Sequence, residues 1–254
     1  MASAQQRVFQ GLRHLERLPE VWRCSRETAD WPKLFSAYIG LKRTLPFTIA
    51  LRSGSFEFDE ASDIPTFWQV FFRNVYPVYP DDRIIVDAGA NIGSFSLYAL
   101  ENAPSCRLIS IEPAPDTFAR LRGLIEAHHL ESRCTLYQAA LGDRDGETCI
   151  RLAPGSQFRR TGADGHPVPM YRLESLLPAD TEIDFLKLDI EGGEYTVLRS
   201  TPPQVLRRFR RIVMEYHPAE PARNAIEPLL SAGFRILRQQ DDGNGYGLVS
   251  FERK

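Results

Sequence analysis

Long apolar runs are absent from this sequence, since no window approaches the roughly 20 hydrophobic residues that a membrane-spanning helix needs. The first ten residues are polar and lack the apolar core of a secretory signal. Cysteine is scarce, and the four widely spaced cysteines, without a C-x-x-C pair, favour reduced thiols over two disulfides. An excess of charge is also lacking, because the net charge is −2. We therefore expect a cytoplasmic protein that has no membrane span and binds no nucleic acid.

What the chain does contain is an ordinary globular composition, with 43% hydrophobic and 25% charged residues. Its 254 residues suffice for one large domain and a smaller appendage. A change of pattern divides the chain into an N-terminal extension of helices and a hairpin, residues 1–80, and a main domain, residues 81–254. We expect the extension to act as a substrate lid or an oligomer contact. The oligomeric state stays open, with a homodimer as one option.

Within the extension, leucines at helical spacing end at Leu18, and we expect Pro19 to interrupt the helix. Residues 47–52 and 56–58 are predicted as two strands joined by a Ser-Gly turn. The aromatic-rich stretch 64–76 is predicted as a helix whose rings form core packing or a substrate lid.

From residue 83 onward, strand and helix patterns alternate, which is typical of βα units around a parallel sheet. The predicted strands are 84–88, 107–111, 133–138, 184–189, 209–216, 233–238 and 246–251, and the predicted helices are 93–101, 115–128, 192–199 and 220–232. Glycines and prolines between 146 and 176 predict an irregular segment with two short edge strands at about 147–152 and 168–171. The glycine-rich turn at 241–245 predicts a closing hairpin. The fold class is therefore α/β, with a Rossmann-like, mostly parallel sheet of about seven strands and an antiparallel C-terminal strand.

Residues 84–93, which read I-I-V-D-A-G-A-N-I-G, are the most informative segment. The predicted strand ends at Asp87, and Gly89 and Gly93 lie in a turn that lets the backbone approach a ligand. The spacing is G-x-x-x-G and differs from the G-x-G-x-x-G of dinucleotide-binding folds. With an acid on the preceding strand, the segment resembles the first motif of class I S-adenosylmethionine-dependent methyltransferases.

A second acid, Glu112, follows the next predicted strand, about 20 residues beyond the glycines, a separation that suits one intervening helix. A carboxylate there can accept hydrogen bonds from both hydroxyls of a ribose. The alternative is an exposed acid before a helix N-terminus. In combination with the glycine loop, the ribose role is favoured.

Two polar side chains of the loop have alternative interpretations. Asp87 could stabilise the amino group of the cofactor, act through water, or fix loop amides. Asn91 could orient the loop, reach the cofactor carboxylate, or cap the following helix. Together with Gly89, Ala90 and Gly93, they form the predicted cofactor loop.

Two acids follow the fourth predicted strand, in the segment D-F-L-K-L-D-I-E-G-G-E at 184–194. Ligands collect at the carboxyl ends of parallel strands, and Asp189 and Glu191 face the same side if the strand persists. Such carboxylates can raise one another's pKa, bind a divalent cation or accept a substrate proton. Alternatively, Glu191 caps the next helix and Asp189 alone faces the site. Lys187 shares their parity and could pair with either.

The fifth predicted strand ends in M-E-Y-H-P, which places Glu215 and His217 on one face. His217 is a candidate general base for the deprotonation of a hydroxyl. The alternative is a surface histidine beside a proline.

The ordered motifs V-D-A-G-A-N-I-G, I-E-P-A-P, A-A-L-G-D and L-K-L-D-I-E-G-G-E resemble the FkbM family of S-adenosylmethionine-dependent methyltransferases. The resemblance implies a class I methyltransferase fold, with residues 81–254 as the cofactor-binding domain. It also implies O-methylation of a hydroxyl on a small molecule or glycan, such as a sugar, glycolipid or polyketide. The residues it implies for cofactor binding are Asp87, Gly89, Asn91, Gly93 and Glu112, and those for the transfer site are Asp189 and Glu191.

Methyltransferases often hold adenine just after the third strand, where Ala140 and Leu141 lie; Asp143 could add an acid there, although a plain turn is favoured. No tight metal-binding motif is present, so the sequence predicts no resident metal, although the acids could bind a divalent cation.

Three alternatives remain, namely a nucleic-acid methyltransferase, a nicotinamide-dependent enzyme and a catalytically idle cofactor-binding scaffold. The fourth strand ends in D-I-E-G and lacks the N-P-P-Y-type turn that clamps a flipped base. The best evidence for a polyanion is an arginine cluster, which a solvated helix end and strand edge also explain: Arg199, Arg207, Arg208, Arg210 and Arg211.

Overall fold

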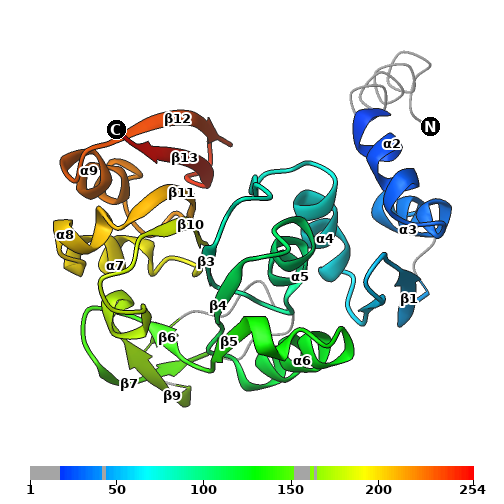
Figure 1. The fold of residues 1–254 in the computed structure, drawn as a ribbon, viewed down its shortest axis with the longest axis horizontal. Coiled ribbons are helices and arrows are strands. Elements are labelled where there is room, and N and C mark those ends of the chain that lie inside the picture. Colours follow the sequence, from blue (N-terminus) through cyan, green and yellow to red (C-terminus); the bar gives the residue numbers. More distant parts are fainter. Residues whose placement is uncertain (1–17, 42–43, 152–160, 163–164) are drawn as a thin grey trace. The chain divides into compact units, whose positions relative to one another are not determined.

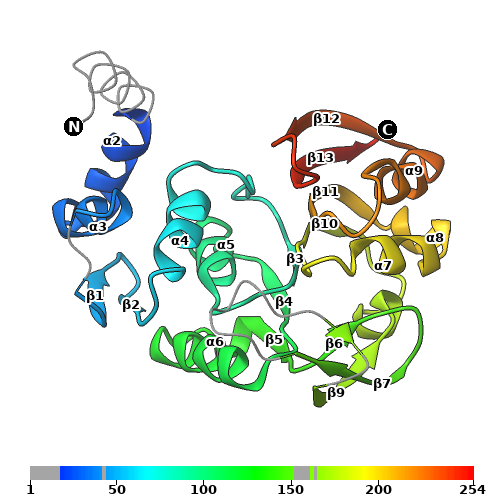
Figure 2. The ribbon, with the colours of Figure 1, turned by 180° about the vertical axis from the view of Figure 1, so that it is seen from behind.

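The computed structural model describes residues 18–41, 44–151, 161–162 and 165–254. The chain divides into two compact units, Met1–Val75 and Tyr76–Lys254. Figures 1 and 2 show the elements of both units from opposite sides. The role of the N-terminal extension as a lid or oligomer contact stays a prediction.

The first unit contains three helices and a hairpin among its described residues: α2 (Leu18–Glu27), α3 (Trp31–Tyr38), β1 (Phe47–Ala50), β2 (Ser55–Phe58) and α4 (Asp63–Phe71). Pro19 lies in the first turn of α2, where its missing N–H costs no intrahelical hydrogen bond. The leucine pattern before Leu18 lies outside the described residues, so the expected interruption stays a prediction. Helix α4 is shorter than the predicted 64–76, and its rings are buried, with Phe67 stacked on Phe71 at 4.1 Å. The aromatic residues therefore form the core of this unit.

The second unit is built on a seven-stranded sheet in the order β12-β13-β11-β10-β3-β4-β5. Its strands are β3 (Ile84–Ala88), β4 (Arg107–Ile111), β5 (Cys134–Tyr137), β10 (Ile183–Leu188), β11 (Phe209–Tyr216), β12 (Phe234–Asp241) and β13 (Gly247–Arg253). Each lies within a few residues of its predicted position. Only β13 runs antiparallel to its neighbours, so the predicted fold class and the closing hairpin are confirmed.

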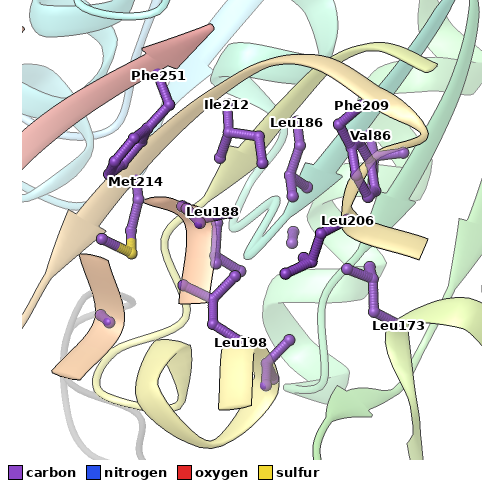
Figure 3. Packing of buried hydrophobic residues seen from close by; sticks show 14 of the residues in the cluster. Val86, Leu173, Leu186, Leu188, Leu198, Leu206, Phe209, Ile212, Met214 and Phe251 are labelled. Carbon is purple, nitrogen blue, oxygen red and sulfur yellow. The ribbon is translucent and has the colours of Figure 1, made fainter. Parts of the chain in front are cut away.

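Helices cover both faces of this sheet (Figure 1). They are α5 (Ser94–Asn102), α6 (Pro115–Ala127), α7 (Glu194–Ser200), α8 (Pro203–Leu206) and α9 (Arg223–Ser231), with 3₁₀ turns η1 (Glu131–Arg133) and η3 (Leu173–Leu176). Figure 3 shows Leu198 of α7 and Leu206 of α8 among Leu188 and Met214 of the central strands. Apolar residues at alternate positions of the central strands pack against these helices and form the main hydrophobic core. On the opposite face, Phe95 of α5 packs against a ring of β10.

Four short strands form a second sheet in the order β6-β9-β7-β8. They are β6 (Ala140–Leu141), β7 (Gly146–Ile150), β8 (Thr161–Gly162) and β9 (His166–Tyr171). The two expected edge strands, at about 147–152 and 168–171, are confirmed as β7 and β9. They belong to a separate sheet that the sequence did not predict. Alternating apolar residues of these strands, such as Val168 and Met170, are buried with Ile150 and Ala140 in a small core of their own.

The order of strands creates a topological switch point between β3 and β10. The chain leaves β3 toward β4 and β5, and later returns to β10 on the other side of β3. In open α/β sheets, ligands bind outside the carboxyl ends of strands at such a point. A ligand-binding site is therefore expected at the loops after β3 and β10. Of the helices in the described residues, none has the length and apolarity needed to cross a membrane.

Candidate functional site

The two glycines of the loop after β3 are required by the chain's own packing. Gly89 has φ +82°, and a Cβ there would lie 1.7 Å from the backbone oxygen of Asp189. Gly93 has φ +93°, and a Cβ there would lie 2.8 Å from Leu121 Cδ1. Glycine at 89 thus lets the loop after β3 touch the loop after β10, in addition to any approach to a ligand.

Glu112 is buried and braces this loop. Its Oε2 accepts the amide of Asn91 at 2.9 Å, and its Oε1 accepts the amide of Ala114 at 2.9 Å. The alternative of an exposed acid before a helix is therefore wrong. The side chain ties the tip of the loop to the carboxyl end of β4, where a ribose would have to lie.

Asn91 adopts a left-handed conformation, with φ +51°. Its Oδ1 accepts the amide of Ile92 at 2.8 Å, while Gly93 is the residue that precedes helix α5. The helix-cap alternative for Asn91 is therefore wrong, because the side chain acts within the loop. Ala90 is buried, and its carbonyl accepts the amide of Gly93 at 2.9 Å.

A buried lysine connects the loop to the acids of β3 and β10. The Nζ of Lys187 donates to the carbonyl of Gly89 at 2.7 Å and lies 3.2 Å from Asp87 Oδ1 and 3.6 Å from Asp189 Oδ2. Burial lowers the pKa of Lys187, but the charges of Asp87 and Asp189 outweigh it and raise the pKa above its usual value. The predicted pairing of Lys187 is thus confirmed for Asp189, while its pairing with Asp87 was not predicted.

Asp87 itself has no exposed surface, and its Oδ2 accepts the hydroxyl of Ser96 at 2.7 Å. Asp87 helps to fix the loop through its ion pair with Lys187. The sequence-based alternative instead expected it to accept hydrogen bonds from loop amides. A role of Asp87 in cofactor binding stays a prediction.

Asp189, Glu191 and His217 come together at the carboxyl ends of β10 and β11. The Nε2 of His217 lies 3.3 Å from Glu191 Oε2 and 3.9 Å from Asp189 Oδ1. The side chain of His217 is 4% exposed and those of the two acids are each 25% exposed, so the surface-histidine alternative is wrong. Strand alternation does not explain the meeting, because β10 ends at Leu188 and Glu191 has φ +57°.

Glu194 is a member of this group that the sequence did not single out. It is fully buried at the start of α7, and its carboxylate accepts the amides of Ile190 at 2.8 Å and Gly192 at 3.0 Å. Its Oε1 also lies 3.2 Å from Nδ1 of His217. The helix-capping alternative for Glu191 is wrong, because the residue at the N-cap of α7 is Gly193. The sequence signal that could have identified Glu194 is its place as the second glutamate of E-G-G-E, at the first position of a helix.

Crowding of acids shifts the pKa values of the group. Burial and the charge of Asp189 raise the pKa of Glu191 and of Glu215 to about 7. Burial lowers the pKa of His217, but the hydrogen bond to Glu194 and the surrounding acids raise it to about 9. Since proteins perturb pKa values most strongly at functional sites, these shifts mark the cluster as a candidate site.

Ala140 and Leu141 lie in β6, where they pair with Met170 and Tyr171 of β9. Ala140 is buried in the same small core as Ala114, whose amide is held by the carboxylate that braces the loop. The structure therefore places the predicted adenine segment beside the β4 end. An adenine contact stays a prediction.

Residues 87–237 match the family model described as the methyltransferase FkbM domain, which covers more than half of the chain. The chain belongs to the FkbM methyltransferase family. The membership confirms the family that the four motifs predicted, and it makes the chain a methyltransferase. Every predicted site residue, from Asp87 to His217, lies inside the matched segment.

Relatives in this family share about a quarter of their residues with the chain. Methyltransferase 1 of Beauveria bassiana is 28% identical over 204 residues, which cover 68% of this chain and 82% of the relative. The 31-O-demethyl-FK506 methyltransferase FkbM of Streptomyces tacrolimicus is 26% identical over 212 residues, covering 67% and 79%. The crystal structure of methyltransferase FkbM from Methylobacillus flagellatus KT has a TM-score of 0.54 at 14% identity. That match covers 95% of this chain and 60% of the solved chain, so it supports the fold alone.

Proposed function

We propose that the chain is an S-adenosylmethionine-dependent O-methyltransferase whose acceptor is a hydroxyl of a small molecule or glycan. The observation that carries this proposal is the contact between the loop of Gly89 and the backbone of Asp189 at the switch point of the sheet. It sets a nucleotide-type loop directly beside a cluster of proton-accepting side chains. A donor and an acceptor bound at these loops would be neighbours.

The cofactor would bind along the loop of residues 87–93. Glu112 would hold the ribose, because its carboxylate lies at the carboxyl end of β4 and the amides of Asn91 and Ala114 fix its position beside the loop. The carbonyl of Gly89 is already taken by Lys187, which keeps the loop in place before a ligand arrives. Preorganisation of this kind lowers the entropic cost of binding.

Methyl transfer is an in-line displacement in which positioning supplies much of the acceleration. An alcohol oxygen becomes a good nucleophile only when its proton has a place to go. Asp189, Glu191 and His217 provide carboxylate and imidazole groups for that purpose, beside the cofactor loop. The name of the Streptomyces relative describes a protein that methylates an oxygen of 31-O-demethyl-FK506, which supports an oxygen acceptor here.

The arginine cluster supports a small acceptor more than a nucleic acid, because its members are engaged within the unit. Arg211 pairs with Asp82 at 2.5 Å, and Arg199 pairs with Glu220 at 2.7 Å. The others contact Asp184 (Arg210), the carbonyl of Ala232 (Arg207) and the carbonyl of Thr181 (Arg208). Ion pairs therefore offset the charge of three of the five arginines, which leaves less positive charge to attract phosphates.

The ribose assignment is tested by titrating S-adenosylmethionine into the protein in a calorimeter. Glu112→Ala should weaken binding at least tenfold, because it removes both the ribose acceptor and the brace on Asn91. Glu126→Ala, at an exposed position of α6, is the matched control and should bind like wild type. An unchanged affinity in a folded Glu112→Ala protein would sink the assignment.

The acceptor is tested by following labelled methyl groups into a panel of sugars, glycolipids, polyketides and RNA. We expect label in an alkali-stable ether of a hydroxylated small molecule or glycan. Label in RNA would favour the nucleic-acid alternative. Cofactor binding without transfer across the panel would favour the idle scaffold.

A further inference from the structure

We propose that Asp189, Glu191 and His217 form a binding site for one divalent transition-metal ion, of the kind that Mn²⁺ occupies. The existence of the site stands on the geometry of these side chains, and only its part in methyl transfer rests on the proposed function. The sequence predicted no resident metal, because D-x-E followed 26 positions later by histidine is not a recognised ligand spacing. The fold brings the three together.

The separations of the three side chains suit the shell of a single ion. One ligand atom from each lies within 4.8 Å of the others, and His217 Nε2 lies 3.3 Å from Glu191 and 3.9 Å from Asp189. Around an octahedral ion with bonds of about 2.1 Å, adjacent ligand atoms are about 3 Å apart and opposite ones about 4.2 Å. Small side-chain rotations would therefore close the shell on one side of the ion.

His217 is oriented as metal-binding histidines are. Its Nδ1 faces the Glu194 carboxylate at 3.2 Å, so an N–H there is held by an acid, and Nε2 faces Asp189 and Glu191, where it becomes a ligand when a bound ion displaces its proton. Glu194 is fully buried and fixed by the amides of Ile190 and Gly192. A carboxylate behind the distal nitrogen sets the tautomer and raises the basicity of a ligating imidazole. This contact distinguishes the group from a set of surface acids.

The charge around the three residues favours a cation. Five carboxyl groups gather at this end of the sheet, those of Asp87, Asp189, Glu191, Glu194 and Glu215, against the side chains of Lys187 and His217. Lys187 is already shared between Asp87, Asp189 and the carbonyl of Gly89. A divalent ion between Asp189 and Glu191 would offset the excess.

The donor set indicates which ion fits and what it would do. Two carboxylates and one imidazole suit Mn²⁺ better than the softer, thiolate-bound ions. The acids are each 25% exposed, which leaves the outer side of the ion open to water and to the acceptor hydroxyl. Because the three side chains would then be ligands and not proton acceptors, a hydroxyl coordinated to the ion would release its proton to water. Its oxygen then bonds to the methyl carbon as the carbon–sulfur bond breaks, and the sulfur keeps the electron pair.

The site is tested by titrating Mn²⁺ into the chelator-treated full-length chain and following free Mn²⁺ by electron paramagnetic resonance. We expect one saturable ion per chain. Asp189→Asn, Glu191→Gln and His217→Gln should each weaken binding at least tenfold, and Glu194→Gln by about tenfold. Glu126→Gln is the control and should bind like wild type. No saturable binding, or equal binding in all variants, would overturn the proposal.

A second measurement covers the case in which a variant fails to fold. Pulsed resonance of Mn²⁺ bound to the wild-type chain should show coupling to the nitrogen of one imidazole, and bound Mn²⁺ without such coupling would overturn the site. Calorimetry with S-adenosylmethionine alone separates this proposal from the proposed function. Cofactor binding without Mn²⁺ binding overturns only the metal site, while Mn²⁺ binding without cofactor binding overturns only the function.

Discussion

At the scale of single residues, Lys187 is the side chain that connects the parts of the candidate site. Its ammonium contacts the carbonyl of Gly89 and the carboxylates of Asp87 and Asp189, so it joins the predicted cofactor loop to the predicted transfer site. The side chain is 6% exposed and that of Asp87 is not exposed at all. A buried pair of this kind is costly to break, because the partner that remains keeps an uncompensated charge.

Lys187→Met should therefore lower the free energy of unfolding by about 3–5 kcal/mol, as expected when one partner of a buried ion pair is removed. Urea denaturation measures the change. The double variant Lys187→Met with Asp87→Asn removes the orphaned charge and should recover part of the loss. A double variant no more stable than the single one would contradict the charge argument.

The residues of the site were predictable to different degrees. The motif pointed to Asp189 and Glu191, and the sequence also named His217. What brings them together is the pairing of β10 with β11 and the left-handed backbone at Glu191, and neither is encoded in a local pattern. Glu194 was missed because a glutamate at the start of a helix usually needs no explanation beyond the helix dipole.

At the scale of elements, the close approach between the loop after β3 and the loop after β10 explains why residue 89 is a glycine. Gly89→Ala would place a methyl group 1.7 Å from the oxygen of Asp189, at a φ of +82°. We expect a loss of more than about 3 kcal/mol in unfolding free energy, since the backbone of one loop must move. Chemical denaturation gives the value.

Gly243→Ala is a matched control for this substitution. Gly243 has a φ of +80° with no atom within 4 Å of the added Cβ, so only the left-handed conformation is penalised, at about 1–2 kcal/mol. Similar losses of unfolding free energy in both variants would show that the left-handed backbone conformation, and not the contact with Asp189, is the reason for glycine at position 89.

Asp184 fastens the opposite, amino-terminal ends of three strands. Its Oδ2 accepts the amides of Arg83 at 2.7 Å and Ile84 at 3.0 Å, and its Oδ1 lies 3.1 Å from Arg210. Burial raises the pKa of Asp184, but the amide hydrogen bonds and Arg210 outweigh it and hold the pKa below its usual value. The charged form therefore stabilises the alignment of β3, β10 and β11.

This carboxylate should give the protein a pH-dependent stability. Because the folded pKa lies below the unfolded value of about 3.9, the contribution is complete above that value and is lost as the pH falls through the folded pKa. Asp184→Asn should be less stable than wild type at pH 7, and the difference should narrow as the pH approaches 3. Urea unfolding across that range checks it, and a constant difference would contradict it.

Elements with a strong local pattern were predicted well, and the second sheet was not. The apolar strand Ile84–Ala88 and the hairpin around 241–245 carry clear signals, and both formed where expected. The expected edge strands correspond to β7 and β9, but β6 has only two residues, and the apolar residues of these strands acquire a core only when the strands meet each other. Pairing between distant short strands is a tertiary effect that propensity does not report.

At the scale of the whole molecule, two hydrophobic clusters of the second unit, Tyr76–Lys254, consist only of residues beyond position 76. Sequence pattern gave the number of strands but not their order, because any right-handed arrangement of βα units has the same local signature. The order is fixed by which apolar faces fit together, such as those of Leu186 and Ile212 on neighbouring strands.

The fragment 76–254 should therefore fold by itself, with a single cooperative urea transition, and bind S-adenosylmethionine within about threefold of the full chain, since a domain with its own core can fold alone. The fragment must keep Tyr76, whose hydroxyl donates to Glu215 at 3.3 Å. A fragment without a cooperative transition would show that residues before 76 complete the core.

The contact between Gly89 and the backbone of Asp189 also constrains how such an enzyme could be redesigned. The two segments lie 100 positions apart in the chain, yet one has no side chain because the other fills its space. An insertion or deletion in either loop would displace both the proposed binding site of the methyl donor and that of the methyl acceptor. Attempts to change the acceptor should therefore keep these two loop lengths and vary only side chains.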